Sequence, residues 1–153
     1  MKVINWIAVI FSMIYSTSAQ GRKLCFLPND FPNDPPKCLS CPNPNDFCRW
    51  TSIEEASKFI DVRQPEEEPT YNPPRMLYPE QYPGQCLTFF ETSRTVGLFD
   101  CESASADIKH RVWHLPGNSI YLDHFGSVKF TKLGDIVSVG GEHSRKGLTT
   151  FWN

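Results

Sequence analysis

The stretch Val96–Trp113, VGLFDCESASADIKHRVW, runs from alternating residues through Cys101 and a polar segment to a tryptophan. Trp113 stands twelve positions after Cys101. The same interval separates Cys38 from Trp50 in CLSCPNPNDFCRW. A spacing that recurs far apart in a chain is typical of an internal repeat, which predicts a third copy.

The third copy lacks the cysteines. Gly140 lies twelve positions before Trp152, and DIVSVGG stands where VGLFDC stands in the earlier copy. GSVKF, from Gly126, likewise stands where GQCLTF stands from Gly84. Three units of about forty residues, each made of short strands, are what a β-trefoil requires. We therefore predict an all-β, disulfide-stabilised β-trefoil.

Proline divides the chain into two parts. After Gly84, short β-branched or aromatic runs alternate with glycine-rich turns, which predicts strands. Twelve of the thirteen prolines fall between Pro28 and Pro83. Residues 64–84 are therefore expected to form a proline-rich surface insertion without regular structure. Residues 51–60, TSIEEASKFI, fit either a short helix or a turn followed by a strand.

The amino terminus predicts secretion. Residues 1–19 combine one lysine, an apolar run too short to span a bilayer and a small-residue end, which indicates a signal peptide. The domain then comprises residues 20–153, is extracellular and has no membrane span after signal removal. Without Lys2 the chain has 14 of its 15 basic residues and 17 acidic residues. Because this charge balance is nearly neutral, nucleic acid is not an expected partner.

All six cysteines lie after the signal peptide. An even number of cysteines in a secreted chain indicates three disulfides. Zinc is the alternative for the four amino-terminal cysteines, but secreted thiols tend to oxidise, so we expect no metal site. Six cysteines allow fifteen pairings, so spacing leaves the connectivity open.

The motifs CLTFF, VGLFDC and RVW resemble those of the ricin B-type lectin trefoil. The ending RKGLTTFW is similar to that of the cysteine-rich amino-terminal domain of the mannose-receptor group, whose third unit also lacks its cysteine pair. The resemblance covers residues 84–153 well and residues 22–60 weakly. It implies three disulfides, Cys25–Cys38, Cys41–Cys48 and Cys86–Cys101, and a shared core built from three tryptophans, Trp50, Trp113 and Trp152.

The resemblance also implies where a ligand binds. Lectins of this type place an aspartate two residues after the first cysteine of a unit, but this chain has Leu27, Thr88 and Phe130 at those positions. We therefore expect the galactose-type site to be lost in all three units. The sulfated-sugar site of the mannose-receptor group lies in the third unit, where the candidate ligands for an anionic group here are His143, Arg145 and Lys146.

These residues predict a secreted lectin-like binding module for an extracellular glycan or glycoprotein, anionic or sulfated glycans included. The alternative is a secreted effector or inhibitor that binds an extracellular protein through the insertion, with Tyr71, Tyr78 and Tyr82 as contact residues. His110 and His114, with Lys109 beside them, resemble the groups of an acid–base site for phosphodiester cleavage, but no motif of a secreted ribonuclease surrounds them. We therefore predict a protein without enzymatic activity and without a cofactor.

Overall fold

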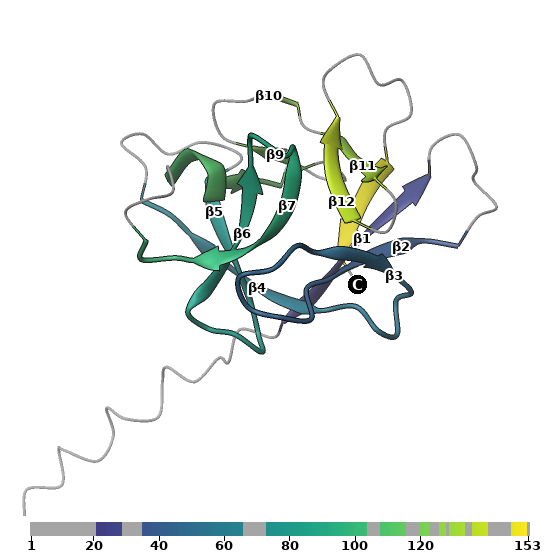
Figure 1. Ribbon diagram of the computed structural model, residues 1–153, viewed down its shortest axis with the longest axis horizontal. Helices are drawn as coiled ribbons and strands as arrows, with labels where there is room; N and C mark the ends of the chain where they lie inside the picture. The colour runs from purple at the N-terminus through teal and green to yellow at the C-terminus, as the bar shows by residue number, and fades with distance from the viewer. Residues whose placement is uncertain are drawn as a thin grey trace, which may run out of the picture.

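The computed structural model describes residues 21–28, 35–65, 73–103, 108–115, 120–122, 126–127, 129–133, 136–140 and 148–152. Within these ranges the chain is all-β, and its thirteen strands belong to one sheet that curls into a half-barrel (Figure 1). A short 3-10 helix, η1 (Ile108–Arg111), is the one helical element in this part of the chain. The predicted signal peptide, residues 1–19, lies outside the described residues.

Every strand in the first part of the chain has at least three residues, whereas the second part includes three strands of two residues. The first seven are β1 (Arg22–Pro28), β2 (Lys37–Ser40), β3 (Arg49–Thr51), β4 (Lys58–Arg63), β5 (Arg75–Pro79), β6 (Gln85–Phe90) and β7 (Thr95–Asp100). The other six are β8 (Trp113–His114), β9 (Tyr121–Leu122), β10 (Gly126–Ser127), β11 (Lys129–Leu133), β12 (Ile136–Gly140) and β13 (Leu148–Trp152).

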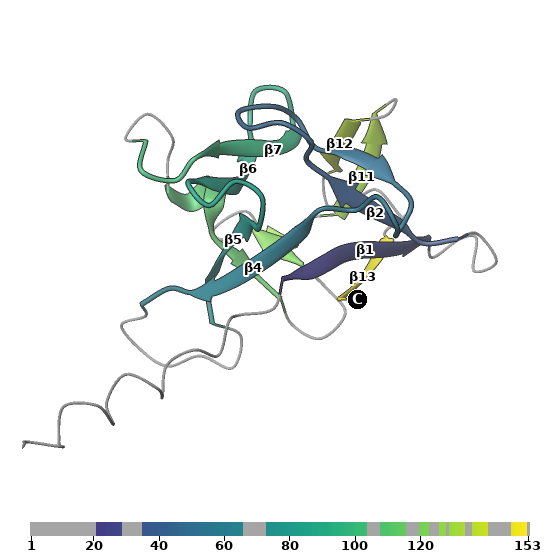
Figure 2. The same cartoon turned by 90° about the horizontal axis from the view of Figure 1, so that it is seen from below.

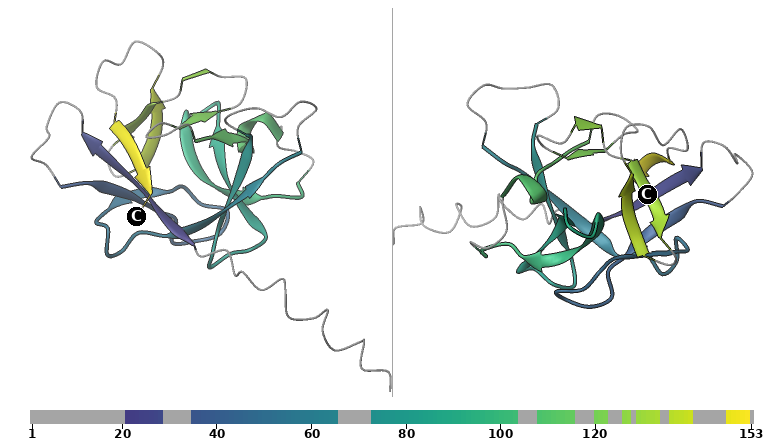
Figure 3. Two further views of the ribbon diagram at one scale, coloured as in Figure 1. Left: turned by 180° about the vertical axis from the view of Figure 1, so that it is seen from behind. Right: turned by 45° about the horizontal axis from the view of Figure 1, so that its top comes forward.

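The strand pairs form two groups. Hairpins β2–β3, β6–β7 and β11–β12 form one group, in which β12 also pairs with both β3 and β7. The other group is a run of antiparallel neighbours in which β13 pairs with β1, β1 with β4, β4 with β5, β5 with β8 and β8 with β9. Figure 2 shows the hairpins β6–β7 and β11–β12 on one side of the long strands β1 and β4. Because β1 pairs with β13, the first and last of the described strands lie side by side (Figure 3).

The three disulfides join Cys25 to Cys38, Cys41 to Cys48 and Cys86 to Cys101. These are the pairs that the resemblance implies. Cys25 lies directly opposite Cys38 in the register of β1 and β2, so the first bridge ties two neighbouring strands. All six cysteine side chains are described, and none is free.

One main core fills the inside of the curled sheet. Its buried members come from all parts of the fold: Leu24, Phe26, Leu39, Phe59, Leu77, Leu87, Val96, Leu98, Trp113, Leu122 and Val137. Trp113 is fully buried, and its indole N–H donates to the carbonyl of Leu87 at 2.9 Å. Trp50 is only half-buried and packs on this core edge-to-face against Phe26. Trp50 and Trp113 are therefore not equally buried. The side chain of Trp152 lies outside the described residues.

The proline-rich segment differs from the expectation. Residues 75–79 form β5, which pairs with β4 and β8, and the side chains of Met76 and Leu77 are buried. The prediction of a surface insertion without regular structure is therefore wrong for these residues. The prolines flank the strand or stand at its end, where a missing backbone donor costs little.

Residues 51–60 form a turn followed by β4, which is one of the two structures that the sequence allowed. The Thr51 hydroxyl donates to the Glu55 carboxylate at 2.8 Å within the turn. The Lys23 ammonium donates to the carbonyl of Ile53, which holds the turn against β1. Ala56 and Ile53 then pack on the Cys25–Cys38 bridge as a second, smaller core.

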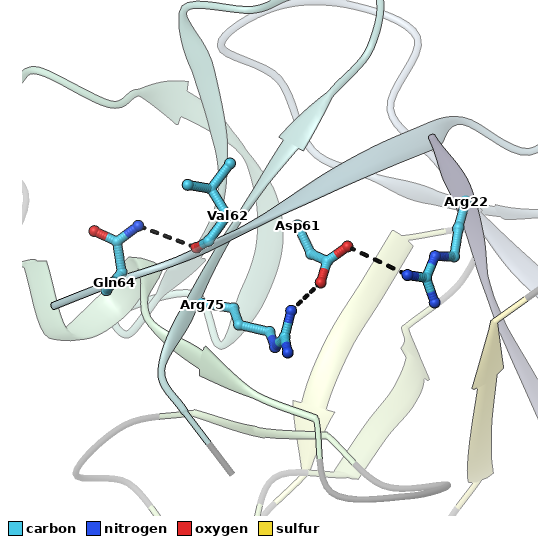
Figure 4. A network of polar contacts seen from close by, with 5 residues as sticks. All are labelled: Arg22, Asp61, Val62, Gln64 and Arg75. Carbon is cyan, nitrogen blue, oxygen red and sulfur yellow. Dashed lines mark hydrogen bonds and ion pairs between the residues drawn. The ribbon is translucent and has the colours of Figure 1, made fainter. Parts of the chain in front are cut away.

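A charged network joins three neighbouring strands (Figure 4). The Arg75 guanidinium on β5 donates to the Asp61 carboxylate on β4, and Arg22 on β1 lies 4.0 Å from the same carboxylate. The Val62 side chain points to the opposite side of β4, because successive side chains of a strand alternate. The Asp61 carboxylate thus lies on the same face of β4 as the buried Phe59, whereas Ile60 and the exposed Val62 lie on the other face.

Candidate functional site

A well-formed hollow in the described part of the chain lies beside the β6–β7 hairpin, and we call it the aromatic hollow. Its volume is about 650 Å³, which is within the range of small-molecule sites. Four phenylalanines and seven polar residues line it: Phe47, Phe89, Phe90 and Phe99, with Asn45, Asp46, Thr88, Glu91, Thr92, Ser93 and His110.

One wall of the aromatic hollow is the loop that ends at Cys48. The disulfide between Cys41 and Cys48 closes this loop at its base. Backbone hydrogen bonds of 2.9 Å join it to β7, from the Cys48 N–H to the Val96 carbonyl and from the Leu98 N–H to the Asp46 carbonyl. The wall is therefore fixed by main-chain contacts and does not depend on flexible side chains.

Gly97 allows this close approach. A Cβ on Gly97 would lie 2.5 Å from the Asp46 carbonyl oxygen and 3.0 Å from the Phe47 Cα. Phe47 and Gly97 also form a β-bridge. Only a residue without a side chain lets the loop lie directly on β7.

Three of the rings contact one another edge-to-face. The Phe90 ring centroid lies 5.7 Å from that of Phe47 and 6.0 Å from that of Phe99, with interplanar angles of 90° and 85°. Phe89 and His110 meet in the same way at 6.0 Å. These distances are typical of favourable aromatic pairs, so the rings hold each other in place. Phe47 nevertheless keeps 36% of its surface exposed.

Asp46 supplies a fixed carboxylate at this wall. One oxygen accepts from the Phe47 N–H at 2.8 Å and the other from the Asn43 amide at 3.3 Å. These two hydrogen bonds, with a smaller effect of the nearby Arg49, lower the pKa of Asp46 below its usual value. Asn45, with a φ of 55°, forms the tip of the loop, and its N–H donates to the Gln85 side chain.

The turn between β6 and β7 supplies the other polar groups. The Glu91 carboxylate is 65% exposed and lies 3.4 Å from the His110 Nε2, a contact that becomes an ion pair when the imidazole is protonated. The Ser93 hydroxyl is hydrogen-bonded to that of Thr95 at 2.6 Å. Arg94, with a φ of 53°, closes the turn. The hollow thus combines apolar rings with hydroxyl, amide and carboxylate groups.

The candidate residues from the sequence fall in different places. His143, Arg145, Lys146 and Tyr71 lie outside the described residues. The Tyr82 hydroxyl donates to the Pro42 carbonyl at 2.6 Å, and its ring packs on the main core, so its contacts are structural.

Tyr78 has a different environment. It is half-buried on the outer face of β5, where burial raises the pKa of Tyr78 and the Glu102 carboxylate adds to this effect. With Ile60, Val62, Pro79, Glu80 and Pro83 it lines a second hollow of about 240 Å³. The structure does not bring Tyr78 and Tyr82 together in either hollow.

Two further predictions concern Thr88 and the two histidines. Thr88 stands at the position of the lectin aspartate and lines the hollow, but a threonine has no carboxylate. Its side chain is buried, and its hydroxyl donates to the Cys86 carbonyl at 3.0 Å. His114 lies half-buried on β8 and is not a lining residue, whereas His110 is. The Arg111 guanidinium is buried and donates to the carbonyls of Cys101 and Ser103. The two histidines are therefore not brought together in this hollow.

Sequence reasoning missed the aromatic hollow, whose rings come from the loop before Cys48 and from both strands of a later hairpin. Its one local signal is Gly97, a glycine in the middle of a strand, which often marks a close backbone approach.

Comparison with protein-family models and with curated proteins finds no match for this sequence. In the described ranges, no helix is long and apolar enough to cross a membrane. The same ranges contain no group of three or more histidine, cysteine, aspartate or glutamate side chains placed to hold a metal ion. The candidate site therefore rests on the chemistry of the aromatic hollow itself.

Proposed function

We propose that the chain is a β-trefoil. In that fold each unit has four strands, of which the second and third form a hairpin while the first and fourth join a barrel. The hairpins β2–β3, β6–β7 and β11–β12 fit the first role, and the neighbours β13, β1, β4, β5, β8 and β9 fit the second. A pairing of β9 with β13, which would complete the ring, is not among the pairs that the described residues form.

The protein is proposed to be secreted. Three disulfides in a domain of this size are consistent with an extracellular protein, because such bonds persist in oxidising compartments. The proposal adds to this the signal-peptide pattern of residues 1–19.

Its proposed activity is the binding of a glycan, without catalysis, in the aromatic hollow. The observation that carries the proposal is the combination of rings and polar groups in one hollow of about 650 Å³. Sugars present an apolar C–H face and a rim of hydroxyls, and a site for them needs rings for the first and carboxylate, amide or hydroxyl groups for the second. Asp46 and Glu91 supply here the carboxylates that Thr88 cannot.

The test of this proposal uses a panel of oligosaccharides titrated into the mature protein. Phe47→Ala removes the most exposed ring of the hollow without opening the main core, so it should weaken glycan binding about tenfold or more. Val62→Ala is the matched control, because Val62 is also an exposed large apolar residue but lies on the outer face of β4. Equal affinities of the two variants would contradict the proposal.

A second candidate function, protein binding, is favoured by the hollow on the outer face of β4 and β5. Its volume of about 240 Å³ is smaller than that of most ligand sites and suits one side chain of a partner. Ile60 and Tyr78 face each other across the two strands, and Val62 is 43% exposed. In this case Val62→Lys should abolish capture of an extracellular protein and Phe47→Ala should leave it unchanged.

A further inference from the structure

The charge of the aromatic hollow narrows the class of glycan that it takes. Asp46 and Glu91 both line it, and its described lining contains no lysine or arginine. We propose, on the basis of the glycan-binding function above, that the ligand is an oligosaccharide of hexosamine units with free, positively charged amino groups. The ammonium would meet the two carboxylates while the sugar ring contacts the phenylalanines.

The Asp46 carboxylate is held ready for a cation. Its hydrogen bonds from the Phe47 N–H and the Asn43 amide fix its position, and they favour the ionised form. Each carboxylate oxygen has two acceptor sites, so each can accept a further bond from an ammonium donor. The carboxylate therefore needs no rearrangement to bind.

Glu91 places a second negative charge on the turn between β6 and β7. Its exposure of 65% leaves it accessible to a ligand, and His110 at 3.4 Å contacts it from inside the hollow. The nearest cations in sequence, Arg49 and Arg94, are exposed and do not line the hollow.

The rings add to this preference. An ammonium close to an aromatic face is attracted by the ring quadrupole, and this attraction is absent for a neutral acetamido group. A sulfate or carboxylate on the sugar would instead meet two like charges. The hollow therefore selects against anionic glycans. The residues that the sequence suggested for an anionic group, His143, Arg145 and Lys146, are not among its described lining residues.

The experiment compares two hexasaccharides that differ only in acetylation, a glucosamine hexamer and an N-acetylglucosamine hexamer. Both are titrated into the mature protein at low and high salt, beside a lysine hexapeptide as a probe of charge alone. We expect the glucosamine hexamer to bind at least about tenfold more tightly than its acetylated form, because charge-assisted hydrogen bonds are roughly twice as strong as neutral ones. The preference should shrink at high salt.

Variants identify the groups responsible. Glu91→Gln keeps the size and exposure of the side chain and should remove most of the preference for the free amine. Glu102→Gln is the matched control, because Glu102 is an exposed carboxylate that does not line the hollow, and it should leave the preference intact.

Each other outcome overturns the inference in a recognisable way. Equal binding of the two hexasaccharides would refute the amino-sugar preference and leave the glycan-binding function standing. Binding of neither would refute the amino-sugar inference, and the oligosaccharide panel would then decide the glycan-binding function separately. A lysine hexapeptide that binds as tightly as the glucosamine hexamer, or a preference that Glu102→Gln removes as well as Glu91→Gln, would show attraction to surface charge without sugar recognition.

Discussion

Gly97→Ala tests the contact that builds the aromatic hollow. The new methyl group would lie 2.5 Å from the Asp46 carbonyl oxygen and 2.9 Å from the Phe90 ring, closer than nonbonded atoms normally approach. Because the first of these atoms belongs to the backbone, the loop must move away from β7. The move would break the 2.9 Å hydrogen bond from the Leu98 N–H to the Asp46 carbonyl. It would also strain the neighbouring hydrogen bond from the Cys48 N–H to the Val96 carbonyl. Overpacking and the lost bonds together should cost about 2–4 kcal/mol.

The assay is thermal unfolding with the disulfides intact. For a domain of this size the loss corresponds to a melting temperature lower by roughly 6–12 °C. Gly84→Ala is the matched control, since a Cβ on Gly84 would meet no atom within 4 Å, and its effect should stay within about 1 kcal/mol. Equal melting temperatures for the two variants would refute the close approach of the loop to β7. Glycan binding should be weakened by Gly97→Ala and not by Gly84→Ala.

Three further predictions concern stability. Trp113→Ala should cost about 3–5 kcal/mol in urea unfolding, because the side chain is fully buried, whereas the half-buried Trp50→Ala should cost clearly less. Peptide mapping should find the Cys86–Cys101 disulfide, and replacing both cysteines by serine should cost about 3 kcal/mol in the same assay. The hydrogen bond from the Phe47 N–H lowers the pKa of Asp46 in the folded state. The contribution of Asp46 to the free energy of unfolding is therefore present above its ordinary pKa of 3.8 and is lost as the pH falls through the lower pKa of the folded state. Melting temperatures below pH about 4 should therefore fall more steeply for the wild type than for Asp46→Asn.

The number of disulfides followed from the cysteine count, and the strands of the second part of the chain were predictable because their signals are local. The pairing of the cysteines came from the resemblance, since spacing left it open. Cys25 and Cys38 are thirteen residues apart, and Cys86 and Cys101 are fifteen apart, so each bridge spans one turn between neighbouring strands. Likewise, CLTFF and VGLF alternate or branch as strands do, and the turn between them carries polar residues. Each of these features depends on a few residues that are close in sequence.

Strand β5 was missed because its pairing with other strands, and not its own sequence, determines its structure. Arg75–Pro79, RMLYP, is short and stands among prolines, so composition favours a loop. Its pairing with β4 and β8 and the burial of Leu77 depend on partners on both sides, and those partners are not visible in the segment itself. The interval of twelve residues similarly locates Trp50 and Trp113 but not how deeply each is buried.

The aromatic hollow shows why a site assembled from distant segments is harder to predict than a site within one motif. Phe47 and Phe90 are far apart in the sequence, and no local pattern relates the loop before Cys48 to the β6–β7 hairpin. What joins them is Gly97, together with the hydrogen bonds that its missing side chain permits. Asp46 and Glu91, which both line the hollow, also lie far apart in the chain, so the charge that is proposed to favour an ammonium ligand becomes visible only in the folded structure. An aspartate two residues after Cys86 would have been visible within one short motif, whereas Thr88 stands there and this hollow is assembled from two distant segments.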